Sequence, residues 1–181
     1  YSQKDGITIV TQCSLDRLPL IKAMCEQWQG AISLAIYIKK EELKTFLQNY
    51  TANMDDNWKP HKVAKHLEKK GTEIFAEIVK FWNGIEYGNQ GDYAALDIHL
   101  LFEIEHDSDT CVEDNAGPVR VMYPVNALRN LALRYAKSDY VFLLDADFVP
   151  SSNMHALVLS MLRRKPYLVS PKIAFVVPAW E

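Results

Sequence analysis

The stretch ITIVTQCSLDRLPLIKAMCEQWQGAISLAIYI, residues 7–38, decides the fold of this chain. It opens on a short β-branched run that predicts a strand over residues 7–12, and it closes on a second strand-like run over residues 32–38. Between the two runs, apolar residues recur at helical spacing: Leu18, Ile21, Met24, Cys25 and Trp28. We therefore expect a β-α-β unit, in which the helix carries the chain between parallel strands.

The segments that follow extend this pattern into an α/β domain. A helix is expected over residues 41–50, so the order is β-α-β-α, which favours a mostly parallel sheet flanked by helices. Charges cluster from about residue 54 to residue 96, where we expect an insertion with one amphipathic helix, or two broken near Gly71. A strand over residues 96–105 and an acidic loop over residues 106–118 come next. Together they fit a single domain over residues 1–181.

The composition limits the partners of the chain. Its 181 residues and 49% hydrophobic content suffice for one domain with a sizeable core. Acids and bases are mixed and the net charge is -3, so no nucleic acid partner is expected. The apolar runs fall far short of the roughly 20 residues that span a bilayer, so we expect neither an anchor nor a signal peptide within this chain.

A second informative stretch, YPVNALRNLALRYAKSDYVFLLDADFVPS, covers residues 123–151. Pro124 suits the first turn of a helix. The buried stripe of that helix is expected to contain Val125, Leu128, Leu131, Ala132 and Tyr135. Asn126, Arg129 and Asn130 fall at i, i+3 and i+4, so they share another side. The strand that follows, residues 140–144, is apolar at successive positions, which predicts cover on both faces and a central place in a parallel sheet.

This strand runs into two acids, Asp145 and Asp147, with one residue between them. In extended backbone their side chains point to the same side, at the carboxyl end of a strand, where open α/β sheets bind ligands. Their mutual repulsion is relieved by a shared proton or by a divalent cation. Mg²⁺ or Mn²⁺ suits hard oxygen ligands and completes its shell with phosphate oxygens, so a nucleotide diphosphate is the expected ligand. The alternative is a pair of acids in a solvated turn.

Four segments together resemble glycosyltransferase family 49, which includes the LARGE-type enzymes and β-1,4-glucuronyltransferase. They are the stretch over residues 123–151, the opening ITIVTQCSLDRL, the strand ISLAIYI and the closing VVPAWE. The resemblance implies a GT-A fold with a Rossmann-like sheet, C-terminally incomplete at Glu181. It implies metal-dependent transfer of a sugar, glucuronic acid, from a UDP-sugar to a glycan or glycoprotein acceptor with inversion. The reaction would take place in the Golgi lumen, behind a membrane anchor outside this chain.

The same resemblance implies a role for particular residues. Asp145 and Asp147 are then the Asp-x-Asp motif that holds Mn²⁺, or Mg²⁺, on the donor diphosphate. The residues beside the donor are Thr11, Gln12, Arg17, Asn126, Arg129, Asn130 and Asp145. The residues alone leave simpler alternatives open, because Thr11 and Gln12 can just end a strand and Arg17 can be a solvated residue at a helix start.

The catalytic residue and the reaction class stay open at this point. Inversion requires a general base, which we do not assign, although Glu181 is a candidate to face the acceptor. The resemblance implies a further metal ligand, commonly a histidine, beyond Glu181. LLDADFV also fits the haloacid-dehalogenase phosphatase pattern, in which Asp145 is the nucleophile. A sugar-nucleotide-binding module without turnover is the other alternative.

Overall fold

The structure is a computed structural model that describes residues 6–39, 42, 60–87, 95–103, 122–165, 167 and 173–179, with the side chains of the longest helix given from residue 73 on. Three predicted features lie outside the described residues: the helix over residues 41–50 except Glu42, the acidic loop over residues 106–118, and Glu181.

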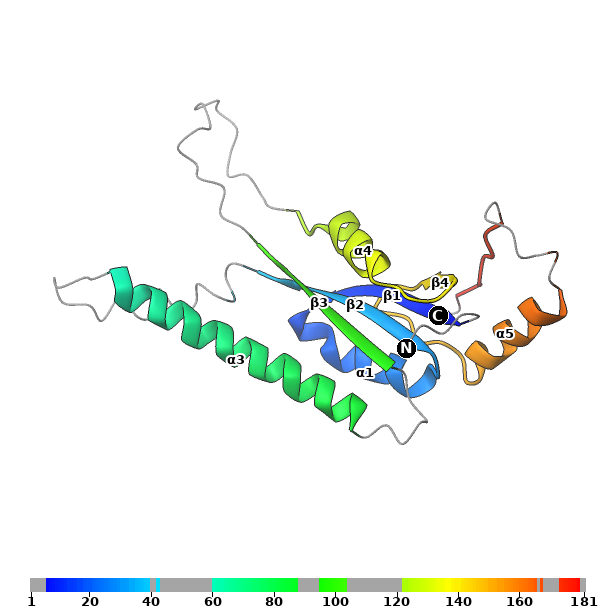
Figure 1. The fold of residues 1–181 in the computed structure, drawn as a ribbon, viewed down its shortest axis with the longest axis horizontal. Helices are drawn as coiled ribbons and strands as arrows, with labels where there is room; N and C mark the ends of the chain where they lie inside the picture. Colours follow the sequence, from blue (N-terminus) through cyan, green and yellow to red (C-terminus); the bar gives the residue numbers. More distant parts are fainter. Residues whose placement is uncertain are drawn as a thin grey trace, which may run out of the picture.

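A parallel sheet of four strands forms the centre of the described part of the chain (Figure 1). The strands are β1 (Ile7–Ser14), β2 (Ala31–Ile38), β3 (Ala95–Phe102) and β4 (Tyr140–Leu143). They lie in the order β3-β2-β1-β4, and Val10 of β1 lies opposite Ser33 of β2 on one side and Leu143 of β4 on the other. The predicted α/β class with a Rossmann-like sheet is confirmed.

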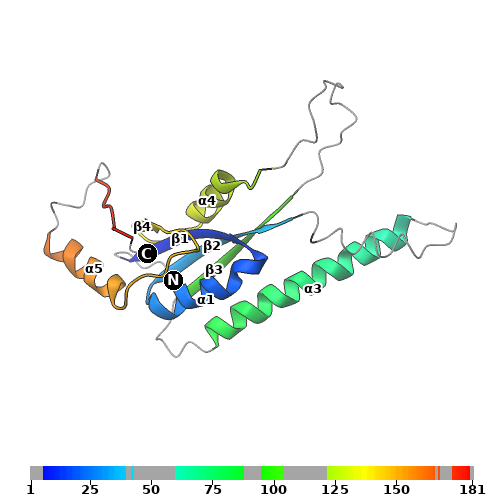
Figure 2. The same cartoon turned by 180° about the vertical axis from the view of Figure 1, so that it is seen from behind.

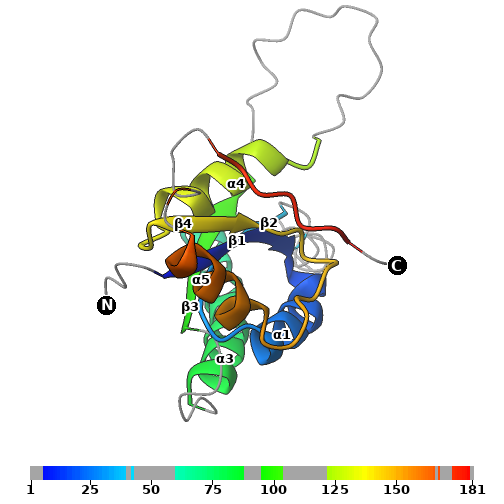
Figure 3. The ribbon, with the colours of Figure 1, turned by 90° about the vertical axis from the view of Figure 1, so that its right-hand side faces the viewer.

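Helices cover both faces of this sheet. They are α1 (Leu18–Gln27), which follows the 3-10 turn η1 (Leu15–Arg17), α3 (Pro60–Glu86), α4 (Val125–Arg134) and α5 (Met154–Arg164). Viewed end-on, α1 and α3 lie on one face and α4 on the other (Figure 3). The view from behind shows α3 extending past the sheet (Figure 2). No described helix combines the length and apolar character that a membrane span requires.

The segment predicted as an insertion contains α3, which links β2 to β3. Of the two forms expected for it, the structure has one helix that continues through Gly71. Ile74 and Ile78 of this helix are buried in the core, so α3 packs on the sheet through its amphipathic face. The insertion itself stays a prediction.

Alternate residues of β1 and β2 face opposite layers, because successive side chains of a strand point to opposite faces. On the α1 side, Ile9 and Ile36 pack in the larger core with Ile21 of α1. On the other side, Val10, Ala35 and Tyr37 pack against Leu128 and Ala132 of α4. The sheet is therefore held between two apolar layers. The predicted stripe of α4 is confirmed for Leu128, Ala132 and, in part, Leu131, but Tyr135 at its end is 47% exposed.

β4 differs from the strand that its sequence predicts. It pairs with β1 on one side, and no strand of the described residues pairs with its other side. Val141 is 44% exposed and Leu143 is 59% exposed, while Tyr140 and Phe142 pack partly on the α1 side. The prediction of a central strand covered on both faces is thus wrong for the described part of the chain, because α4 packs over β1 and β2 instead of over β4.

The order in which strands are added to the sheet reverses between β1 and β4, although all four strands are parallel. The strands β1, β2 and β3 follow one another toward one edge, with α1 and α3 on the same face. After β3 the chain returns to the far side of β1, and α4 lies on the opposite face. Such a reversal opens a crevice at the carboxyl ends of the two strands, which is where open α/β sheets bind ligands.

Candidate functional site

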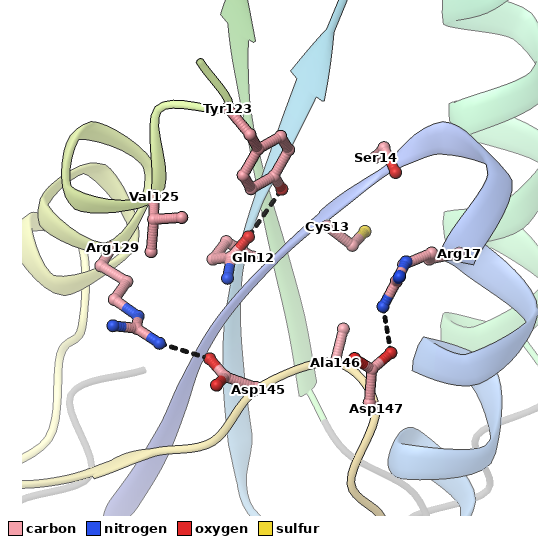
Figure 4. A pocket seen from close by; sticks show the side chains of 10 residues that line it. All are labelled: Gln12, Cys13, Ser14, Arg17, Tyr123, Val125, Arg129, Asp145, Ala146 and Asp147. Atoms are coloured by element: carbon pink, nitrogen blue, oxygen red, sulfur yellow. Dashed lines mark hydrogen bonds and ion pairs between the residues drawn. The ribbon is translucent and has the colours of Figure 1, made fainter.

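A hollow of about 330 Å³ lies at the carboxyl ends of β1 and β4 (Figure 4). The end of β1 and the turn η1 form one wall, the start of α4 forms a second, and the loop after β4 forms the third. The hollow therefore occupies the crevice that the reversal of strand order creates.

Both aspartates line this hollow from the loop after β4. The backbone N–H of Phe148 donates to the carbonyl of Asp145 at 3.1 Å, so the pair sits in a tight turn and not in the extended backbone that we expected. Ala146, between them, is buried in the core. The turn nevertheless brings both carboxylates to one cavity.

Each carboxylate is paired with an arginine from a different element. Arg129 of α4 donates through Nη2 to Oδ1 of Asp145 at 2.6 Å, and Arg17 of η1 donates through Nη1 to Oδ1 of Asp147. Figure 4 shows the aspartates pointing to opposite sides, each toward its own arginine. The pKa of the Arg17 guanidinium is raised by its hydrogen bond to Asp147 and by the charge of that carboxylate. The four groups balance in formal charge.

Gln12 at the end of β1 and Tyr123 just before α4 line the hollow where these two elements approach each other. The hydroxyl of Tyr123 donates to Oε1 of Gln12 at 2.6 Å, and its ring packs edge-on against Tyr37 with the ring centroids 5.4 Å apart. Burial raises the pKa of Tyr123 to about 12, and burial raises the pKa of the Cys13 thiol to about 12. Both groups are therefore protonated and neutral near pH 7, and Cys13 is not a thiolate nucleophile there.

The whole site lies within a segment that matches a known family. The family model described as "Glycosyl-transferase for dystroglycan" matches residues 6–181. The chain belongs to this glycosyltransferase family.

The relatives of this chain are much longer than the chain. The glycosyltransferase-like protein gnt13 of Dictyostelium discoideum is 32% identical over 158 residues, which are 85% of this chain and 17% of that protein. The xylosyl- and glucuronyltransferase LARGE2 of Mus musculus is 28% identical over 99% of the chain and 19% of its own length. The xylosyl- and glucuronyltransferase LARGE1 of Homo sapiens is 27% identical over 97% of the chain and 16% of its own length. The chain thus spans less than a fifth of each relative.

The hollow brings most of the predicted residues together. The predicted residues that line the hollow are Gln12, Arg17, Arg129, Asp145 and Asp147. They come from β1, η1, α4 and the loop after β4, so their meeting depends on the fold and not on any local pattern.

Three predicted residues do not line the hollow. Thr11 is buried in the sheet, and its Oγ1 has no hydrogen-bond partner among the described residues. Asn126 and Asn130 are exposed on α4. They lie one turn apart on one side of the helix, whereas Arg129 shares the side of Val125, which does line the hollow.

The sequence reasoning missed five residues that line the hollow: Cys13, Ser14, Tyr123, Val125 and Ala146, which lies between the two aspartates. A signal for them existed in their neighbours. Cys13 and Ser14 directly follow Gln12 at the end of β1, and Tyr123 directly precedes Pro124 at the start of α4. Residues at the ends of elements that meet at one edge of the sheet are candidates for the same site.

The carboxylate pair has the chemistry of a cation site. Two aspartates offer hard oxygen ligands to one hollow, which suits Mg²⁺ or Mn²⁺. Within the described ranges, no group of three or more His, Cys, Asp or Glu side chains is placed to hold a metal. The described side chains alone therefore leave part of an octahedral shell to other ligands.

Proposed function

We propose that the protein transfers a sugar from a UDP-sugar to a glycan acceptor, with a divalent cation, Mn²⁺ or Mg²⁺, bound at Asp145 and Asp147. One observation carries this proposal: in a chain of a glycosyltransferase family, two carboxylates and two arginines meet in one hollow at the reversal of a parallel sheet. Carboxylates attract a cation and guanidinium groups attract phosphates. A diphosphate with its bound cation would interact with both kinds of group, the cation with the carboxylates and the phosphates with the guanidinium groups.

The residues of the hollow would bind and orient the donor. The cation, when bound, supplies electrostatic stabilisation of the negative charge that grows on the departing UDP. Arg17 and Arg129 approach the hollow from opposite walls, so their fixed N–H donors suit the oxygens of two phosphate groups. No covalent bond to the protein is needed in this scheme.

Gln12 and Tyr123 are the residues that we propose for binding the nucleoside part of the donor. The Tyr123 ring is held by its packing on Tyr37 and by its hydrogen bond to Gln12. Aromatic rings stack on nucleobases, and a side-chain amide has N–H donors for the polar edge of a base. The uridine would therefore lie along Gln12 and Tyr123, and the diphosphate between the arginines.

We propose glucuronic acid as the transferred sugar, inversion at its anomeric carbon, and the Golgi lumen as the location. The support is family membership and the names of the two LARGE relatives, which state xylosyl and glucuronyl transfer. Among the described lining residues, the paired aspartates are the only carboxylates, so the general base has to come from outside this part of the hollow.

The test is sugar transfer by the intact protein. With a glycan acceptor and UDP-glucuronic acid or UDP-xylose, we expect a product with inverted linkage in Mn²⁺, loss of product in EDTA, and recovery when Mn²⁺ is restored. Transfer that persists in EDTA contradicts the cation. Donor binding without transfer supports the binding-module alternative. A phosphorylated Asp145 would support the phosphatase alternative, which the family membership disfavours.

A further inference from the structure

Arg17 and Arg129 hold the carboxylates that a cation would use. We propose that these arginines are exchangeable counter-ions, which neutralise Asp145 and Asp147 in the donor-free protein and move to the phosphates when cation and donor bind. This inference rests on the proposed function and extends it to the order of binding. The cation alone binds weakly, and the cation with a nucleoside diphosphate binds tightly.

The contacts put each arginine in competition with a cation. Arg129 donates to Oδ1 of Asp145, and Arg17 donates to Oδ1 of Asp147. A guanidinium does not lose its proton in a protein, so it keeps its charge in the hollow. An ion that approaches either carboxylate therefore meets a positive charge at hydrogen-bond distance, and the repulsion weakens its binding.

The two ion pairs are open enough to exchange. The four side chains are between 43% and 59% exposed. Ion pairs in such contact with water contribute little to stability, because solvent screens the charges and both side chains lose freedom when they pair. Neither arginine is locked beneath the surface, so each can leave its aspartate without disturbing the core.

A released arginine needs a new anion, and the donor brings one. A diphosphate offers several oxygens, and the planar fork of a guanidinium can donate to two of them at once. When the cation takes the carboxylates and the phosphates take the arginines, every charge in the hollow stays paired. Cation and diphosphate then raise each other's affinity by the same factor, because coupling between two binding equilibria is reciprocal.

Removal of one arginine should have opposite effects on the two ligands. In Arg17→Gln and Arg129→Gln of the intact protein, we expect Mn²⁺ alone to bind about three- to tenfold tighter, because a competing cation is gone. We expect UDP in saturating Mn²⁺ to bind about tenfold weaker, because a phosphate ligand is gone. Free Mn²⁺ measured by electron paramagnetic resonance, with and without UDP, gives the affinity for the ion, and a titration of UDP in saturating Mn²⁺ followed by calorimetry gives the affinity for UDP, both without an activity assay.

Matched variants separate this effect from a general loss of positive charge. Arg134→Gln removes an exposed arginine from α4, the helix that carries Arg129. Lys22→Gln removes an exposed lysine from α1. Neither residue lines the hollow. Both should leave the two affinities unchanged. Arg17→Lys keeps the charge but loses the planar fork, so it should retain weak Mn²⁺ binding and lower the affinity for UDP.

The outcomes distinguish this inference from the proposed function. A wild-type protein that binds no Mn²⁺ even with UDP contradicts the proposed cation site. A wild-type protein that binds both, with Arg17→Gln and Arg129→Gln unchanged or weaker for Mn²⁺ alone, overturns the competition and leaves the function standing. If a glutamine variant fails to fold, the wild type still decides, because an equal Mn²⁺ affinity with and without UDP also overturns it.

Discussion

The strands at the centre of the sheet and the strand that leads to the aspartates have similar apolar residues but different surroundings. β1 and β2 are buried along almost their whole length, whereas β4 is short and alternates between partly buried and exposed residues. The paired acids and bases lie beyond β4, in the turn after β1 and on α4, and their side chains are about half exposed. This difference indicates that the residues that stabilise the fold are not the residues that line the candidate site. The following experiments test that separation.

The largest expected effect is on stability in the buried strands. Ile36 of β2 is fully buried, so Ile36→Ala should lower the free energy of unfolding by about 2–5 kcal/mol through lost burial and a cavity. Leu143→Ala on β4, where the side chain is mostly exposed, should lower it by less than about 1 kcal/mol. Denaturant unfolding of the intact protein measures both. Equal losses in the two variants would mean that β4 is covered in the intact protein, and would contradict the difference in burial between β2 and β4.

The next effect is on activity without a loss of stability. Asp145→Asn and Asp147→Asn should each lower sugar transfer by about a hundred- to a thousandfold, because an amide is a poor ligand for the cation that stabilises the departing diphosphate. The unfolding midpoint should hardly change, since both carboxylates are about half exposed. Asp97→Asn is the matched control, because that carboxylate pairs with Lys137 at 3.1 Å outside the hollow. Undiminished transfer in either site variant contradicts the proposed role.

A pair of glycines gives a smaller effect with opposite signs. A Cβ at Gly30 would lie 2.7 Å from Nε2 of His155 and 2.8 Å from Nε1 of Trp28, so Gly30→Ala should destabilise the protein by about 1–3 kcal/mol. A Cβ at Gly84 in α3 meets nothing within 4 Å, so Gly84→Ala should stabilise it by about 0.5–1 kcal/mol through helix propensity. Thermal unfolding compares the two. Equal shifts in Tm would contradict the close packing at Gly30.

The smallest effect is a pH dependence of stability. Burial lowers the pKa of His155 below its ordinary 6.5, so the unfolded chain takes up a proton more readily than the folded chain. Stability should then fall as the pH drops below about 6.5. Denaturant unfolding at about pH 7.5 and about pH 5.5 should show a smaller loss in His155→Gln than in the wild type. The same loss in both would assign the dependence to other groups, such as His99, whose pKa burial also lowers.

The sequence was sufficient for features that depend on local periodicity. Short apolar runs, the first of them β-branched, predicted β1 and β2, and apolar residues at helical spacing between them predicted α1. The same reasoning predicted the stripe of α4 with Leu128 and Ala132. The acids after β4 were also predicted, since the end of a strand is where a sheet exposes polar groups to a ligand.

The features that were missed depend on contacts between distant segments. Arg17 and Asp147 are 130 positions apart, so no local pattern records their pairing. The apolar run of β4 is equally compatible with a central and an edge strand, because the run does not say whether α4 covers it. Helical spacing grouped Asn126 with Arg129 on one side of α4, but only Arg129 lines the hollow, because the spacing does not say which side of the helix faces it.

The loop that carries the aspartates is held at both ends. At its start, the N–H of Leu144 donates to the carbonyl of Val10 at 3.2 Å. At its far end, Ser152 donates to Oε1 of Gln27 at 2.9 Å, and the ring of His155 lies 4.8 Å from that of Trp28. Such a loop is preorganised, so little conformational entropy is lost when an ion enters. It should also favour ions of small radius over Ca²⁺, which prefers more ligands and a looser cage.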